Sequence, residues 1–524
     1  MLFNSPVFLF GFLPLTLAGF FWLARETPPE RKLAMLWLVA ASLVFYAWWE
    51  VENLLLLGFS LLFNYRLSQH LIRRTAAGQP DRRGLIAGIA VNLGLLGWFK
   101  YATFFAESAG ALVGADWQLG PIVLPLAISF FTFQQISYLV DGHRGRVAAC
   151  APLDYALVVT FFPHLIAGPI VRYQDVLPQF REPSVFRFER NRFGLGLSLF
   201  FIGLFKKMVF ADSIAPYANL AFNAAAEGVT LTFTEAWVGA LAYTCQLYFD
   251  FSGYSDMAIG LACLFGIRFA TNFHSPYQAL SIQEFWRRWH MTLSAFLRDY
   301  LYIALGGNRR GEARRYLNLF LTMLLGGLWH GAGWTFIAWG GLHGLYLVIN
   351  QLWTRWTTGP DGVGRRWQLP RVLAWLLTFL AVVVAWVLFR ASSLETAGAM
   401  LASMAGLNGL QLPNFLAGPL GFLREAGVSF DGFTANVGIP QKYSIGGIGL
   451  LLGIALFTPN SQQWLGRWSP ALGVPAEPSP PRLQRLLLRA RWQPDWRWSA
   501  AVGALAAICF LCFTRVSEFI YFQF

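Results

Sequence analysis

Several uncharged stretches of this chain are nearly long enough to cross a lipid bilayer as helices. Val7 to Ala24 contains no charged residue and approaches the ~20 apolar residues that a spanning helix needs. Similar runs cover 121–140, 372–389 and 499–513. Hydrophobic residues make up 56% of the sequence and charged residues 13%, a membrane composition rather than that of soluble domains. We count roughly a dozen membrane-embedded segments and predict an all-α, polytopic membrane protein.

The net charge of +13 is concentrated in loops that flank these segments. Loops rich in Lys and Arg face the cytoplasm, so topology explains the charge and no nucleic-acid partner is needed. We expect the chain to lie in the bilayer with both termini on the side opposite the basic loops. The basic loops are 25–32, 73–83, 144–146, 172–192, 281–315, 355–371 and 467–497, and the poorly charged ones are 107–120, 223–235 and 391–441.

The apolar stretch from Tyr155 to Val171 begins and ends on basic loops and is interrupted by Pro163 and by Gly168-Pro169. We therefore predict a re-entrant segment. Irregular backbone at that depth must be shielded by protein or line a wet cavity.

A second apolar region also has basic residues at both outer ends. Its two parts, 316–329 and 334–351, are predicted to form a helical hairpin with His330 at its apex. The first limb rises only ~21 Å, less than the ~30 Å of the hydrocarbon core. The apex should therefore lie inside the membrane.

His330 is the first candidate for chemistry, because an ionisable residue at bilayer depth is costly unless it has a partner or water. A structural histidine bonded to a backbone carbonyl is the alternative. Trp329 and Trp334 provide rigid walls beside it. Glycines that would let a backbone or a thin ligand approach are Gly326, Gly327, Gly331 and Gly333.

His290 is the second candidate and closes the stretch Glu284 to His290, which has the pattern of an interfacial amphipathic helix. Membrane anchoring alone would explain that pattern. The arginines that follow form a plausible receptor for phosphates, although positive-inside loop charge is an equal alternative. They are Arg298, Arg309, Arg310, Arg314 and Arg315.

Two further stretches are polar where a simple span would not be. Gln246 to Asp256 is predicted to form a hydrogen-bonded break that lines a cavity. Polar residues including Gln134 are concentrated at the end of the 121–140 span. Both could instead make interhelical contacts. The cysteines form no C-x-x-C pair, and no zinc-protease, nucleotide-hydrolase or serine-esterase motif occurs in its required context, so no metal is predicted.

At this point the chain resembles the membrane-bound O-acyltransferase (MBOAT) family, and within it the polysaccharide-acetylating branch that contains the alginate O-acetyltransferase membrane subunit. The matching stretches are Pro125 to Asp141, Phe161 to Arg172, Gln246 to Gly260, Glu284 to Gly307 and Leu324 to Gly344. The resemblance implies an MBOAT fold with a central tunnel and a catalytic membrane core over 1–390. Beyond it, the composition predicts a C-terminal membrane region over 391–524 with two further spans, joined by a Pro-, Arg- and Trp-rich cytoplasmic connection at 459–497.

The family's essential histidine falls on His330 and its second signature histidine on His290. The resemblance implies transfer of an acyl group from a cytoplasmic thioester, with acetyl-CoA as donor substrate and no bound cofactor. We expect His330 to act as the base and His290 to orient the thioester or relay a proton. The expected donor-binding residues are Arg287, Arg288, Arg298, Trp286 and Trp289; the expected tunnel-lining residues are Trp329, Gly331, Gly333, Asp250, Ser252, Tyr254 and Gln134.

The resemblance also implies a bacterial inner-membrane location, for which the loop charges predict both termini on the periplasmic side. The acceptor would be an exported polysaccharide, acetylated directly or through a periplasmic or membrane-anchored accessory acetyltransferase. A donor on a carrier protein, as in D-alanyl transfer to teichoic acids, remains open. A transporter and a non-catalytic scaffold of an export complex are the rival classes.

Overall fold

A computed structural model describes residues 1–24, 28–117, 119–357, 368–412, 414–430, 437, 441–475 and 480–514 of the protein. Over these ranges the chain is helical, and the extended pairing consists of two isolated bridges, Ala270 with Leu472 and Gln411 with Ser429. The prediction of an all-α protein is confirmed. The predicted position of the C-terminus falls on 515–524, outside the described residues.

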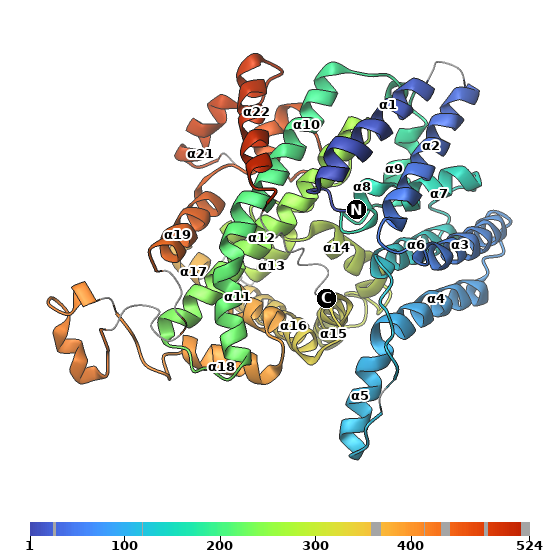
Figure 1. The fold of residues 1–524 in the computed structure, drawn as a ribbon. Coiled ribbons are helices and arrows are strands. Elements are labelled where there is room, and N and C mark those ends of the chain that lie inside the picture. The colour runs from blue at the N-terminus through green and yellow to red at the C-terminus, as the bar shows by residue number, and fades with distance from the viewer. Residues whose placement is uncertain are drawn as a thin grey trace.

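The other helices surround a long central helix, Phe233–Leu264, which is labelled α12 in Figure 1. The longer helices are α1 (Leu13–Leu23), α2 (Pro28–Ala47), α3 (Asn53–Ala76), α4 (Arg82–Leu96), α5 (Ala102–Val113), α6 (Ile128–His143), α10 (Arg190–Phe205), α11 (Asp212–Ala226), α12 (Phe233–Leu264), α15 (Glu312–His330), α16 (Trp334–Thr357), α17 (Arg371–Arg390), α18 (Leu394–Met404), α19 (Gln441–Phe457) and α22 (Trp496–Leu511). The shorter α-helices are α7 (Pro152–Thr160), α8 (Phe162–Leu165), α9 (Tyr173–Phe180), α13 (Ile282–Arg288), α14 (Met291–Phe296), α20 (Ser461–Leu465) and α21 (Arg482–Leu487).

The central helix α12 packs closely against α10 because glycines meet where the two cross. A Cβ atom on Gly203 would lie 2.5 Å from the carbonyl oxygen of Gly253, and one on Gly260 would lie 2.6 Å from the amide nitrogen of Phe200. Small residues let membrane helices approach until backbone contacts backbone. A capping box of Thr232 and Glu235 begins α12.

The prediction of a break over Gln246 to Asp256 is wrong, because α12 runs through it as one helix of 32 residues. The carboxylates are tolerated there because lysines of a neighbouring π-helical turn, Lys206–Ala211, reach them. The ammonium of Lys206 lies 2.6 Å from Asp256, and that of Lys207 lies 2.5 Å from Asp250. Buried charges paired in this way do not require a break in the helix.

The predicted hairpin is confirmed as α15 and α16, although α15 begins four residues before the expected 316. The limbs are in contact because Gly327 faces Gly340: a Cβ atom on Gly327 would lie 2.9 Å from the Cα atom of Gly340. Gly331 then leaves the helical conformation at φ −156° and ψ 149°. The residue before it, His330, is therefore the last of α15.

As predicted, the stretch from Tyr155 to Val171 is interrupted rather than a single helix. Helix α7 ends at Thr160, and the short α8 contains Pro163. The side chain of Ser42 accepts a hydrogen bond at 3.1 Å from the amide of Phe162, and residues 157–171 are all buried. The segment is thus shielded by protein, as irregular backbone at membrane depth requires.

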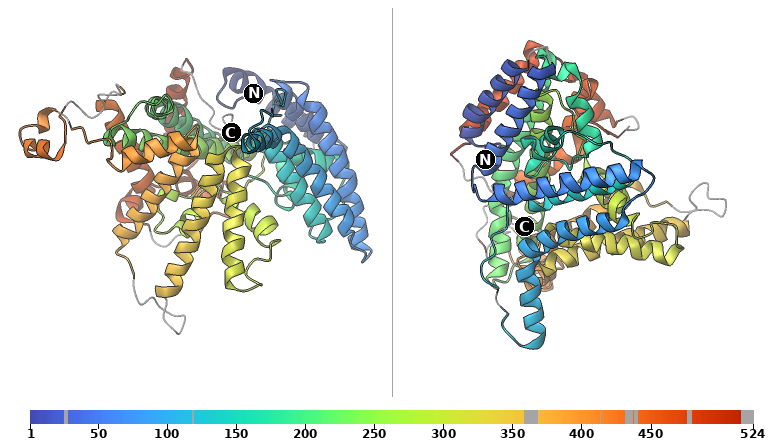
Figure 2. Two further views of the ribbon diagram at one scale, coloured as in Figure 1. Left: turned by 90° about the horizontal axis from the view of Figure 1, so that it is seen from below. Right: turned by 90° about the vertical axis from the view of Figure 1, so that its right-hand side faces the viewer.

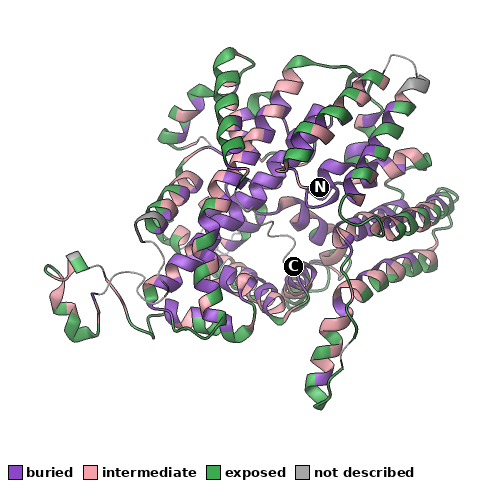
Figure 3. Cartoon of the chain, in the orientation of Figure 1, coloured by how far each residue is buried: buried purple, intermediate pink, exposed green. Residues whose placement is uncertain are grey.

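The expected dozen spans are not confirmed. By length and apolarity, three helical stretches of the described chain could cross a membrane, Arg82–Val113, Arg190–Ala226 and Arg371–Arg390, or four if the bent pair Ser444–Phe457 and Ser461–Trp468 is counted as one span. Helix α12 is long enough, but polar residues lower its mean hydropathy. Many large apolar residues are nevertheless exposed, for example Leu55 at 80% and Val372 at 74%. Figure 3 shows the exposed residues in green, along the outer helices. Such a surface suits contact with lipid.

Two peripheral regions complete the fold. Helix α5 projects away from the other helices (Figures 1 and 2). Within the basic region 459–497, α21 is followed by a 3₁₀ turn over Leu488–Ala490.

Candidate active site

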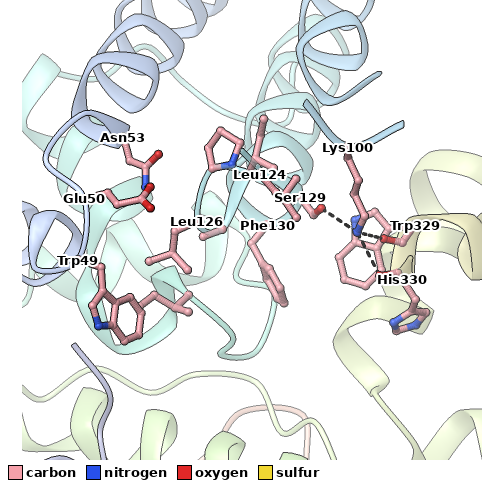
Figure 4. Close-up of a pocket in the computed structure, with 14 residues that line it drawn as sticks. Trp49, Glu50, Asn53, Lys100, Leu124, Leu126, Ser129, Phe130, Trp329 and His330 are labelled. Atoms are coloured by element: carbon pink, nitrogen blue, oxygen red, sulfur yellow. Dashed lines mark hydrogen bonds between the residues drawn. The ribbon is translucent and has the colours of Figure 1, made fainter. Parts of the chain in front are cut away.

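His330 lies at the edge of a cavity of about 390 Å³ beside the hairpin apex, which we call the apex cavity. Figure 4 shows its ring below Trp329, with Lys100 and Ser129 across from it. The residues that line the apex cavity are Trp49, Glu50, Asn53, Lys100, Leu124, Pro125, Leu126, Ala127, Ile128, Ser129, Phe130, Ile166, Trp329 and His330.

The imidazole of His330 is held by ring packing. Its centroid lies 5.2 Å from that of Trp339 and 5.3 Å from that of Phe389, both nearly edge-on. No residue within the described ranges forms a hydrogen bond with either ring nitrogen of His330. A ring held in this way can accept a proton from a bound hydroxyl without first losing a protein partner.

His290 is fully buried, and its ring centroid lies 6.3 Å from that of His330. It connects α13 to α14 with a left-handed backbone, φ 42° and ψ 53°, which is uncommon for a residue other than glycine. The amide of Met291 donates to the carbonyl of Asn272 at 3.0 Å, which helps to hold this turn.

Asn272 also determines which nitrogen of His290 carries the proton. The amide of Thr292 donates to Oδ1 of Asn272 at 3.2 Å, and this oxygen lies 3.1 Å from Nδ1 of His290. Because Oδ1 only accepts, Nδ1 must donate to it. A neutral His290 ring therefore has its lone pair on Nε2.

A second cavity, of about 570 Å³, lies toward the other end of α15, and we call it the basic cavity. Its lining includes Arg287, Arg298 and Arg315, together with Met323 from the middle of α15. The apex cavity instead contacts α15 at Trp329 and His330. The two cavities thus lie along different parts of one helix, the basic cavity against its first half and middle and the apex cavity at its end.

An apolar layer separates the two cavities. Its buried members are Phe130, Ile170, Leu293, Phe296, Leu297 and Trp329. Phe130 and Trp329 also line the apex cavity, whereas Leu297 lines the basic cavity. Phe133 stacks on Phe296 at 4.2 Å and on Trp329 at 5.0 Å between ring centroids, which fills the layer.

Near the basic cavity, Asp299 gathers arginines from three parts of the chain. Its carboxylate lies 2.6 Å from Arg172 and 2.7 Å from Arg298, and Arg144 donates to its backbone carbonyl at 3.4 Å. Partial burial raises the pKa of Asp299, but the hydrogen bonds and charges of Arg298 and Arg172 outweigh it and the pKa is lowered from 3.8. Arg144, Arg146 and Arg309 line an adjacent hollow of about 420 Å³. This face of the protein is strongly basic.

The predicted donor-binding residues divide into two groups. Trp286, Arg287 and Arg298 line the basic cavity. Arg288 instead pairs with Glu284 at 2.9 Å, and Trp289 is buried at 3% exposure. The prediction of an interfacial helix here is wrong, because Phe285, Trp286 and Trp289 pack on aromatic residues of α16 and α17 rather than on lipid.

Of the predicted tunnel-lining residues, Trp329 lines the apex cavity and the others line neither cavity. Gln134 lies 3.0 Å from Nδ1 of His164. A Cβ atom on Gly331 would overlap the ring of Phe336, so this glycine serves the packing of the apex, while Gly333 has no such close neighbour. The remaining residues, Asp250, Ser252 and Tyr254, are buried in α12.

Lys100 and Asn272 belong to the site but were not predicted. Lys100 is the one charged residue between Gly84 and Ala106, so the argument that singles out membrane histidines applies to it as well. Asn272 has no comparable signal, because its role depends on a fold that brings it to His290. Over the described residues, no cluster of three or more His, Cys, Asp or Glu side chains could hold a metal ion.

Several known proteins share extensive sequence similarity with this chain. The family model described as "MBOAT, membrane-bound O-acyltransferase family" matches residues 150–389. The chain is 46% identical over 437 residues to the peptidoglycan O-acetyltransferase of Helicobacter pylori, covering 79% of this chain and 81% of that protein. It is 46% identical over 420 residues to the Pseudomonas aeruginosa protein named "Probable alginate O-acetylase AlgI", covering 79% and 76%.

A more distant relative is the teichoic acid D-alanyltransferase of Bacillus subtilis, 27% identical over 275 residues, which cover 50% of this chain and 68% of that protein. The extent and identity of the nearer matches establish the relationship. This chain belongs to the membrane-bound O-acyltransferase family and is a membrane acyltransferase.

Proposed function

We propose that the protein transfers an acetyl group from cytoplasmic acetyl-CoA to hydroxyl groups of an exported polysaccharide or cell-wall polymer. The observation that carries the proposal is the position of His330, at the apex cavity and 6.3 Å from His290, with a basic cavity at the other end of the same helix. The relatives named for O-acetylation of peptidoglycan and alginate supply the acceptor class.

Charge supports the orientation of the two cavities. Three arginines line the basic cavity, where the phosphates of acetyl-CoA would bind. The loops around the apex cavity, 47–53 and 119–127, contain no Lys or Arg. By the positive-inside rule the basic cavity faces the cytoplasm and the apex cavity faces the periplasm of a bacterial inner membrane.

In the proposed reaction, His330 takes the proton from the acceptor hydroxyl as its oxygen attacks the thioester carbonyl. The carbon–sulfur bond then breaks, and the proton passes to the departing CoA thiolate. The indole N–H groups of Trp329 and Trp339 are buried and have no acceptor among the described residues. They are the candidate donors to the oxyanion. His290, with its lone pair on Nε2, orients the thioester or relays the proton.

The test is transfer from radiolabelled acetyl-CoA in proteoliposomes, with oligomannuronate or peptidoglycan strands as acceptors. Wild type should label an acceptor, His330→Ala should not, and His290→Ala should be strongly impaired. His70→Ala, a control at a side chain that is 53% exposed, should match wild type. Retention volume on gel filtration checks folding. If folded His330→Ala labels the acceptor as wild type does, His330 is not the base.

The same assay separates the remaining alternatives. Transfer only when an acyl carrier protein replaces acetyl-CoA would favour the carrier-dependent reaction. Activity that appears only after an accessory acetyltransferase is added would show that the acetyl group passes through a partner.

A further inference from the structure

Lys100 reaches the end of α15 from a distant part of the chain. It lies in a π-helical turn, Gly97–Tyr101, between α4 and α5. Its ammonium donates to the carbonyl of Trp329 at 2.7 Å and to that of His330 at 3.1 Å (Figure 4). A third contact, at 3.4 Å, goes to the hydroxyl of Ser129 in α6.

These contacts serve carbonyls that the helix itself leaves unpaired. The last carbonyls of an α-helix have no partner within it, and a cation near them interacts favourably with the helix dipole. The hydroxyl of Tyr101 donates to the carbonyl of Leu328 at 2.9 Å. Two consecutive residues therefore bind the carbonyls of 328, 329 and 330 in turn.

The number of donors decides how Lys100 can act. A lysine ammonium has three N–H groups. The three contacts to Trp329, His330 and Ser129 use all of them, which leaves none for a substrate oxyanion. Its effect must therefore pass through the end of α15.

We infer that Lys100 is a positioning residue, which holds the backbone of His330 so that the imidazole meets the acceptor hydroxyl in the apex cavity. The inference rests on the proposed role of His330 as the base. A displacement of a catalytic group by about 1 Å can reduce a rate about 100-fold. Lys100→Met retains the length of the side chain but removes all three donors.

The experiment compares Lys100→Met and Lys100→Arg with Lys32→Met, the same change at an exposed position of α2. Hydrogen–deuterium exchange is measured on peptides covering 326–337, and acetyl transfer is measured with radiolabelled acetyl-CoA. Lys100→Met should accelerate exchange at the apex and lower kcat about 10- to 100-fold, with the KM for acetyl-CoA changed less than about twofold. Lys100→Arg should show slower apex exchange and a higher kcat than Lys100→Met, without reaching the wild-type values. Lys32→Met should match wild type in both measurements.

Unchanged exchange at the apex in Lys100→Met overturns the inference whether or not transfer is detected. A raised KM for the acceptor with unchanged kcat also overturns it, because Lys100 would then contact the acceptor. Exchange in peptides of α10 and α12 reports whether the variant is folded. If His330→Ala remains active while Lys100→Met accelerates apex exchange, the proposed role of His330 as the base fails but the backbone contact stands.

Discussion

Oδ1 of Asn272 lies 3.1 Å from Nδ1 of His290, and the amide of Thr292 donates to the same oxygen. This arrangement selects one tautomer of His290. Asn272→Ala removes the acceptor, so the ring is free to carry its proton on the other nitrogen. We expect kcat for acetyl transfer to fall about 10- to 100-fold. Thr292→Val, which leaves Asn272 in place, should have a smaller effect, and equal losses in both variants would contradict the tautomer argument.

Arg287 and Arg288 are adjacent but differ in their surroundings, because only Arg287 lines the basic cavity. Arg287→Gln should raise the KM for acetyl-CoA about tenfold, since a charge-assisted bond to phosphate is lost. Arg288→Gln should leave this KM nearly unchanged. Initial rates over a range of acetyl-CoA concentrations provide the comparison, and a larger effect in Arg288→Gln would argue against the basic cavity as the donor site.

Asp250 is paired with Lys207 inside the protein, so its replacement should affect stability. Asp250→Asn removes one of two carboxylates around this ammonium, the other being Asp212 at 2.7 Å. Breaking a buried pair costs about 3–5 kcal/mol, and we expect the retained Asp212 to keep the loss at the lower end. Thermal unfolding in detergent measures it, with the exposed Glu182→Gln as control. A normal melting temperature with a raised KM would instead support a tunnel-lining role.

Asp299 should contribute to stability in a pH-dependent way. Its pKa in the folded protein lies below 3.8, so its contribution is present above that value and is lost as the pH falls through the lowered pKa. The difference in melting temperature between wild type and Asp299→Asn should be constant near neutral pH and shrink below about pH 4. A difference that grows on acidification would contradict the assignment.

The hairpin and its histidine could be predicted because their signals are local. Basic residues bound an apolar run, and glycines surround His330 at the break. His290 was identified from its sequence stretch, although the aromatic residues before it were expected to contact lipid. They pack on α16 and α17, which lie more than 40 residues later in the chain and cannot be matched to them by a local pattern.

The polar part of α12 shows the other limit of the sequence argument. Asp250 and Asp256 look unsuited to a continuous buried helix when their own segment is considered alone. Lys206 and Lys207 supply the charges that make it possible, from a turn about 50 residues earlier. Pairing over such distances follows from the packing of α10 on α12, which depends on glycines whose partners the sequence does not reveal.

The apolar layer between the cavities has a consequence for the cell that contains this protein. Phe133, stacked between Phe296 and Trp329, closes the path with rings that offer ions no replacement for their hydration shells. In the proposed orientation of the two cavities, this layer lies across the route between the two membrane faces and opposes the passage of hydrated ions through the site.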